Sequence, residues 1–208
     1  MIKIENYSKN ISGRTVLSDV CLEFNEGEIS LLQGHNGCGK TMLLRAICGL
    51  ISPTSGNIEY SRNYTYGVVI ENPYFMNDET GFYNLKYLAK INNLITDDKI
   101  DDMLKRFNLY DVKNTKVKKY SLGMRQRLGL AQAFMENPDV ILLDEPFNAL
   151  DKENFQIVLD YINEQKNNNK IIVIAAHSLA EKDMGKFDKI VTMNNGIVQE
   201  IADVDRVG

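Results

Sequence analysis

The sequence GHNGCGKT, residues 34–41, matches the pattern G-x-x-x-x-G-K-[ST], and the rest of the chain is arranged around it. A predicted strand with the apolar residues Ile29, Leu31 and Leu32 precedes it, and apolar residues at helical spacing follow from Thr41 to Leu50. In this order of strand, glycine-rich turn and helix, backbone N–H groups curl around a phosphate that also faces the positive end of the helix dipole. The pattern therefore predicts a nucleotide site. We expect it to be bound by Gly34, His35, Asn36, Gly37, Cys38, Gly39, Lys40, Thr41 and Met42.

Four side chains at this site have distinct chemistry. The Lys40 ammonium is expected to reach the β- and γ-phosphates, and the Thr41 hydroxyl to bind Mg²⁺. Asp144 and Glu145 follow the apolar run Val140 to Leu143, at the strand end where ligands of open α/β sheets bind. A strand that simply ends in solvated acids is common, but together with the phosphate loop these acids predict function. We expect Asp144 to hold Mg²⁺ and Glu145 to orient or deprotonate the attacking water.

Apolar patterns in the remaining sequence predict an α/β fold. Strands alternate with helices, which favours a parallel sheet with helices on both faces. The segment ISPTSG, residues 51–56, is expected to be a turn. Strands are expected within residues 2–33, 66–70, 140–143 and 171–175, a hairpin around Asn195-Gly196, and helices within residues 82–135 and 152–165.

Composition excludes several classes of function. The chain has 208 residues, with 24 Lys and Arg against 28 Asp and Glu, for a net charge of −4. This balance argues against nucleic acid as a partner. No apolar run approaches the roughly 18–20 residues needed to cross a bilayer, and no secretory signal precedes residue 8. We therefore expect a cytoplasmic protein.

A further motif points to a family. Tyr120-Ser121-Leu122-Gly123-Met124 resembles the LSGGQ signature of ABC proteins. With the phosphate loop and the paired acids in the right order, the chain is similar over nearly its whole length to the ATP-binding subunit of an ABC transporter. The resemblance implies a P-loop NTPase (RecA-like) core with a parallel sheet and an N-terminal antiparallel β subdomain. It also implies an α-helical subdomain at about 72–136 within one ATPase domain, residues 1–208.

The same resemblance implies partners and further site residues. Ser121, Gly123 and Asp151 are expected to contact the nucleotide held by an opposite subunit, so the working unit is a homodimer or heterodimer of ATPase subunits. His177 corresponds to the family's switch histidine, which holds the water-positioning acid. A transmembrane permease subunit would dock on the helical subdomain, near aromatic residues 74–87, and keep the chain on the inner face of the cell membrane.

Three features depart from or refine the family pattern. Ile11 stands near the position of the usual base-stacking aromatic residue, so discrimination between bases is expected to be poor. Glu71 replaces the usual glutamine and is expected to hold Mg²⁺ or water. Together with YSLGM and ETGFYNL, Glu71 resembles the bacitracin-export branch, whose ATPases serve peptide-antibiotic resistance or lantibiotic immunity. This resemblance implies export of a peptide antibiotic or another small substrate. Cys38, near a helix N-terminus and Lys40, is expected to expose a reactive thiol; the alternative is that it packs inward.

Two alternatives stay open at this point. The chain could be a soluble ABC ATPase without a membrane partner, or a nucleotide-binding regulatory module that does not hydrolyse ATP. The sequence shows no coiled-coil insert or basic stripe, which weighs against the first. Glu145 and His177 weigh against the second.

Overall fold

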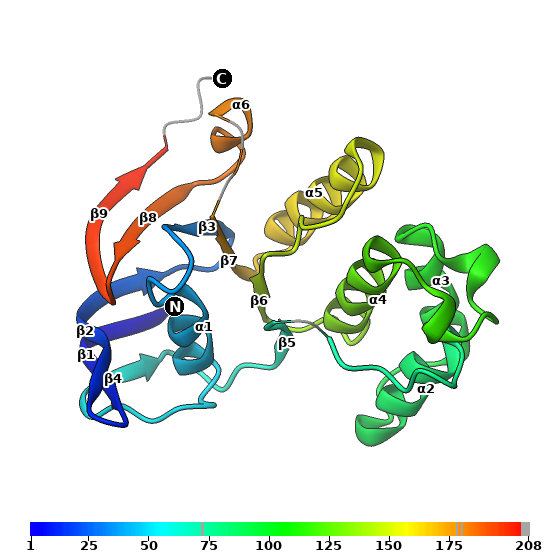
Figure 1. The fold of residues 1–208 in the computed structure, drawn as a ribbon, viewed down its shortest axis with the longest axis horizontal. Helices are drawn as coiled ribbons and strands as arrows, with labels where there is room; N and C mark the ends of the chain where they lie inside the picture. Colours follow the sequence, from blue (N-terminus) through cyan, green and yellow to red (C-terminus); the bar gives the residue numbers. More distant parts are fainter. Residues whose placement is uncertain (72, 178, 180, 205–208) are drawn as a thin grey trace.

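Two β-sheets flanked by helices form the computed structural model, which describes residues 1–71, 73–177, 179 and 181–204 (Figure 1). The larger sheet has six strands in the order β5-β6-β7-β3-β8-β9, and only the pair β8 and β9 is antiparallel. Its strands are β3 (Glu28–Gln33), β5 (Tyr66–Val69), β6 (Val140–Asp144), β7 (Ile171–Ala176), β8 (Lys189–Asn194) and β9 (Ile197–Asp203).

Strand β6 shows why the central strands are uninterruptedly apolar. Val140 and Leu142 belong to the core on one side of the sheet, shared with α1 (Lys40–Ile47) and the smaller sheet. Ile141 and Leu143 belong to the core on the other side, shared with the remaining long helices. Both faces are buried because side chains alternate along a strand. The predicted α/β class with a largely parallel sheet is confirmed.

The smaller sheet is antiparallel and has the order β2-β1-β4. Its strands are β1 (Ile2–Ile11), β2 (Arg14–Phe24) and β4 (Ser55–Tyr60). The expected turn over residues 51–56 is wrong at its end, because β4 already begins at Ser55. Gly56 has φ 81°, and a Cβ there would lie 2.2 Å from the Asn6 carbonyl oxygen. This glycine lets β4 approach β1 where their register shifts, which the turn-like composition conceals.

A helical region stands apart from the smaller sheet, on the far side of β5 and β6 in Figure 1. It contains α2 (Gly81–Asn92), α3 (Asp97–Arg106), α4 (Leu122–Phe134) and the short 3₁₀ turns Tyr110–Val112 and Val117–Lys119. Thr80 and Ser121 cap α2 and α4, since each hydroxyl accepts a backbone N–H of the first turn. The centroid of the Phe134 ring lies 5.0 Å from that of the Tyr161 ring in α5 (Lys152–Asn167). This contact packs the helical region against α5.

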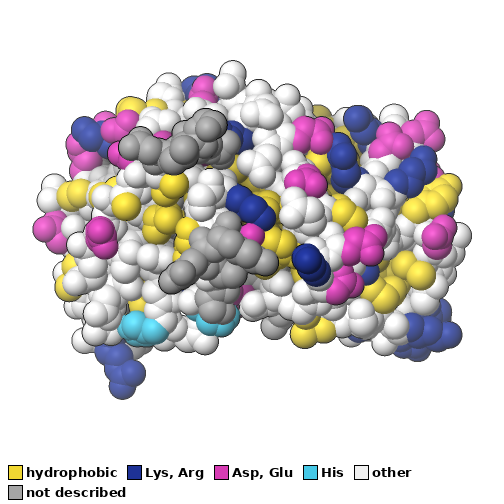
Figure 2. Space-filling model, turned by 90° about the horizontal axis from the view of Figure 1, so that it is seen from above, with side chains coloured by type: hydrophobic (Ala, Val, Ile, Leu, Met, Phe, Trp, Pro, Cys, Tyr) yellow, Lys and Arg dark blue, Asp and Glu magenta, His cyan; other side chains and the backbone are white. Residues whose placement is uncertain are grey.

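The surface carries charges of both signs. In Figure 2 lysines and arginines are interspersed with acidic residues over the face shown. Within the described residues, helices are too short or too polar to span a bilayer. The remaining short helix is α6 (Glu181–Met184).

Candidate functional site

The phosphate loop connects β3 to α1, as the sequence predicts. Gly34, with φ 150°, passes so close to β8 that a Cβ would lie 2.3 Å from the Met193 carbonyl oxygen. Lys40 is only 6% exposed, and its Nζ donates to the carbonyl oxygens of Gly34 at 2.7 Å and His35 at 3.2 Å. The ammonium thus lies inside the curl of the loop, at the N-terminus of α1, where an anion is favoured.

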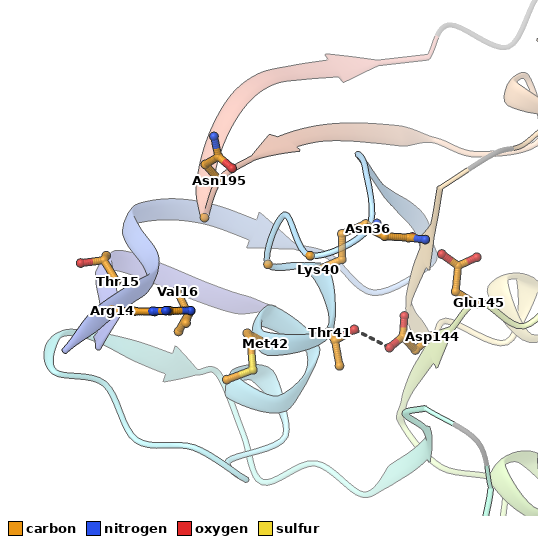
Figure 3. Close-up of a pocket in the computed structure, with 13 residues that line it drawn as sticks. Arg14, Thr15, Val16, Asn36, Lys40, Thr41, Met42, Asp144, Glu145 and Asn195 are labelled. Atoms are coloured by element: carbon orange, nitrogen blue, oxygen red, sulfur yellow. Dashed lines mark hydrogen bonds between the residues drawn. The ribbon is translucent and has the colours of Figure 1, made fainter. Parts of the chain in front are cut away.

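The end of β6 brings oxygen ligands to this loop. The Thr41 hydroxyl donates to Asp144 Oδ2 at 2.6 Å (Figure 3). Asp144 is 7% exposed, and its burial raises the pKa of its carboxyl group, while the bond from Thr41 opposes that rise. A hydroxyl and a carboxylate this close are the hard donors that Mg²⁺ prefers. The pair therefore fits the predicted magnesium site.

Glu145 and His177 meet beside that pair. Glu145 has φ 48°, its N–H donates to the Ala175 carbonyl of β7 at 2.8 Å, and its own carbonyl accepts from Gln126 Nε2 at 3.2 Å. These bonds from two elements hold a backbone conformation that a residue with a side chain rarely adopts. Glu145 Oε1 and His177 Nδ1 are 2.6 Å apart. The structure thus places the two predicted catalytic side chains in contact.

A cavity of about 390 Å³ is lined by half of the predicted site residues. From the sequence prediction it includes Asn36, Gly37, Gly39, Lys40, Thr41, Met42, Asp144 and Glu145. It also includes residues that the prediction missed, namely Arg14, Thr15, Val16, Asn195 and Gly196.

The missed residues come from the start of β2 and from the turn between β8 and β9. Gly196 N–H donates to the Cys38 carbonyl at 2.8 Å, and the Gly196 carbonyl accepts from Ser18 N–H at 2.9 Å. A Cβ on Gly196 would lie 2.6 Å from the Val16 carbonyl oxygen. The Asn-Gly signal did predict a hairpin, but only this tertiary contact brings it to the phosphate loop.

Parts of the loop face away from the cavity. His35 bonds through its ring to the Asn36 carbonyl at 2.9 Å and to Asn194 Oδ1 at 3.1 Å. Cys38 is 1% exposed, belongs to the core shared by α1 and the smaller sheet, and has its Sγ 3.9 Å from Lys40 Nζ. The expectation that Cys38 exposes a reactive thiol is therefore wrong, because the tight curl of the loop directs this side chain inward.

Glu71 also differs from expectation. Its carboxylate pairs with the Arg45 guanidinium at 2.7 Å and is not among the residues that line the cavity. Only the Glu71 backbone approaches Asp144, in a left-handed conformation with φ 61°. The structure does not bring this carboxylate to the Thr41–Asp144 pair, because the nearby guanidinium offers it an opposite charge.

The signature residues lie outside this cavity. The Ser121 hydroxyl accepts from Met124 N–H at 3.2 Å, and Asp151 caps α5 by accepting from Asn154 N–H at 2.8 Å. Gly123 lies against the segment before α5, where a Cβ would be 2.5 Å from the Ala149 carbonyl oxygen. Within one chain, these residues therefore do not meet the phosphate loop.

Comparison with known proteins agrees with this geometry. Residues 17–148 match the family described as ABC transporter. The chain is 40% identical over 205 residues to an ABC transporter ATP-binding protein of Bacillus subtilis, YybJ, with 94% of each chain covered. It is 33% identical to the lantibiotic transport ATP-binding protein SrtF of Streptococcus pyogenes, covering 87% of this chain and 82% of that one.

A solved structure is also similar. The structure of an ATP-binding subunit of an ABC transporter has a TM-score of 0.85 and 27% identity, with 99% of this chain and 90% of that one covered. The resemblance seen in the signature and phosphate-loop residues is confirmed. The chain belongs to the ABC transporter family and is one of its ATP-binding, ATP-hydrolysing subunits.

Proposed function

We propose that this ATPase binds two Mg-ATP between two copies, head to tail, and that hydrolysis drives a separate transmembrane permease that exports a peptide antibiotic. The observation that carries the hydrolytic part is the contact of Glu145 with His177 at 2.6 Å, beside the Thr41–Asp144 pair. A water-orienting acid, a histidine that fixes it and a cation site are thereby gathered at one end of the cavity.

Each of these groups has a defined task in the proposed reaction. Lys40 neutralises charge on the phosphates. Thr41 and Asp144 would hold Mg²⁺, which supplies further charge neutralisation when bound. Glu145 accepts a proton from, or orients, the attacking water, and His177 holds the Glu145 carboxylate in place. Positioning and electrostatics therefore carry the reaction, without a covalent intermediate on the protein.

The dimer is supported because the cavity of a single chain lacks the signature residues. Ser121 and Gly123 lie outside the cavity, and the neighbouring Leu122 is 64% exposed. The N-terminus of α4 therefore offers backbone N–H groups and a hydroxyl to solvent. A second copy turned head to tail would bring this helix end over the phosphates that Lys40 holds.

Mixing two inactive variants tests this arrangement. Lys40→Ala removes the phosphate contact, whereas Ser121→Asp keeps a capping side chain and places negative charge where phosphate would arrive. In a head-to-tail dimer of one copy of each, one site carries both changes and the other carries neither. We expect each variant alone to be inactive and the mixture to recover ATPase activity. A mixture as inactive as its components would contradict the head-to-tail site.

A groove between the sheet and the helical region supports docking of a permease. It has a volume of about 620 Å³ and is lined by residues of β5, α2 and the end of α4. Ile91 and Leu94 on its wall are 71% and 65% exposed. Glu136 Oε2 accepts from Asn92 Nδ2 at 2.8 Å, and its buried Oε1 has no hydrogen-bond partner among the described residues. An apolar segment with a cationic side chain would complement this groove.

Of the aromatic residues expected near this docking region, Tyr74, Tyr83 and Tyr87 are exposed, whereas Phe75 is buried in the core. Ile91→Asp should abolish co-purification with a membrane protein while ATP binding is retained. Leu50→Asp is a matched control, because Leu50 is 67% exposed but lies outside the groove lining. Co-purification of the wild-type chain with soluble partners only would favour an ABC ATPase without a permease.

The cargo is inferred from a relative. SrtF is named as a lantibiotic transport ATP-binding protein, and this chain is 33% identical to SrtF over 188 aligned residues. We expect deletion of this chain to increase sensitivity of its host to lantibiotics or bacitracin, and Glu145→Gln to fail to restore resistance. Unchanged sensitivity to these peptides would exclude them as cargo and leave the ATPase assignment intact.

A further inference from the structure

The nucleotide cavity extends beyond the phosphate loop to a region that none of the catalytic residues occupies. Arg14 and Val16, at the start of β2, line one side of this region, and Asn195 and Gly196, in the turn between β8 and β9, line another. Figure 3 draws the Arg14 side chain alongside Val16, with Thr15 pointing the other way. Arg14, Thr15 and Val16 all line the cavity, and Arg14 and Val16 share one face of the strand because they are two residues apart.

The Arg14 guanidinium has no bonding partner among the described residues. Among the described residues it makes no hydrogen bond or ion pair, although it is an exposed residue that lines the cavity. Lys40, the other cation of the lining, donates to two carbonyl groups of its own loop. A guanidinium without a protein partner at the edge of a ligand cavity is available to the ligand.

The position of Arg14 assigns it to one part of the nucleotide. Lys40 and Thr41 fix the phosphate end, so the base and ribose extend toward the remaining lining, where Arg14 lies. Within the described part of the chain, that lining contains no Phe or Tyr residue. Ile11 pairs directly with Arg14 across the β1–β2 register, yet it is not part of the lining. Among the described lining residues, Arg14 is therefore the one that offers a planar, cationic group to a base.

We propose that the Arg14 guanidinium stacks on the purine base of the bound nucleotide and replaces the aromatic side chain that this cavity lacks. A guanidinium is planar, permanently charged and weakly hydrated, so it stacks on aromatic faces. Stacking contacts the face of a base and does not read its exocyclic groups, so adenine and guanine are held equally well. This inference rests on the assignment of the cavity to a nucleotide.

Calorimetric titration of Arg14→Ala with ADP, GDP and inorganic pyrophosphate, each with Mg²⁺, tests the proposal without hydrolysis. We expect the affinity for ADP and GDP to fall about 10-fold, because stacking on a base contributes about 1–3 kcal/mol. The affinity for pyrophosphate should change less than about twofold, since it has no base. Lys99→Ala removes an exposed cation of α3 outside the cavity and should leave all three affinities unchanged.

Two further variants separate stacking from charge. Arg14→Tyr should regain the affinity for both nucleoside diphosphates, because it restores a planar group. Arg14→Lys keeps the charge without the plane and should bind them as weakly as Arg14→Ala. An equal loss of pyrophosphate affinity in Arg14→Ala, unchanged ADP affinity, or wild-type affinity in Arg14→Lys would overturn the proposal. Failure of the wild-type chain to bind ADP would instead overturn the proposed nucleotide-driven function.

Discussion

Asp144→Asn should stabilise the ligand-free protein while removing its response to magnesium. Burial raises the pKa of the Asp144 carboxyl, and the charge of Glu145 acts in the same direction. A carboxyl whose folded-state pKa is raised destabilises the fold above that pKa and not below the unfolded value of about 3.9. The gain from the substitution is therefore present at neutral pH and disappears as the pH falls toward about 4.

The size of this effect follows from the contacts of the carboxylate. A hydrogen bond to a charged group contributes about 1.5–3 kcal/mol and a neutral one about 0.5–1.5, so weakening the bond from Thr41 costs about 1 kcal/mol. Keeping the charge of a 7%-exposed carboxylate out of water costs several kcal/mol. We expect a net gain of about 1–3 kcal/mol, which for a chain of this size raises the Tm by about 3–10 °C.

Thermal unfolding with and without Mg-ATP measures both parts. At a nucleotide concentration of 100 times Kd, binding should stabilise the wild-type protein by about 2.7 kcal/mol. In Asp144→Asn the added effect of Mg²⁺ over ATP alone should vanish. Asp111→Asn, an exposed position in the helical region, controls for loss of one negative charge and should change stability by less than about 0.5 kcal/mol. A lower Tm for ligand-free Asp144→Asn, or an intact magnesium effect, would refute the reasoning.

Two other substitutions probe how the fold supports the site. Gly123→Ala should lower the free energy of unfolding by about 1–3 kcal/mol, because the new Cβ would lie 2.5 Å from the Ala149 carbonyl oxygen. Urea unfolding measures this loss of stability, and an unchanged midpoint would contradict the prediction. Asp139→Asn should cost about 1–2 kcal/mol at pH 7, since the Thr65 N–H, at 2.9 Å, lowers the pKa of Asp139. A lowered pKa gives stability that is lost as the pH falls through it, so the two proteins should converge in acid, and a constant difference would argue for another cause.

The sequence was sufficient for the parts of the site that are local. Lys40, Thr41, Asp144 and Glu145 were predicted because a loop–helix motif and a strand end each carry their chemistry within a few residues. The contact of Glu145 with His177 needed the family resemblance as well, since 32 residues separate them and only neighbouring strands β6 and β7 bring them together.

The parts that sequence reasoning missed depend on tertiary contact. Arg14 reaches the cavity because β2 passes beside the phosphate loop, and Asn195 because Gly196 bonds to Cys38. Neither of these tertiary contacts produces a periodic pattern in the amino-acid sequence. The folded structure also determines the direction of the Cys38 side chain and the pairing of Glu71 with Arg45. Residue type and spacing alone therefore predicted the wrong environment for Cys38 and Glu71.

The most direct test of the whole account is the behaviour of Glu145→Gln with Mg-ATP. If nucleotide is held between two copies and Glu145 acts on the attacking water, this variant should bind ATP, hydrolyse it about 10²–10⁴-fold more slowly and elute as a stable dimer. With ADP, both this variant and the wild-type protein should elute as monomers. Normal turnover in Glu145→Gln, or a monomer in the presence of Mg-ATP, would contradict the account.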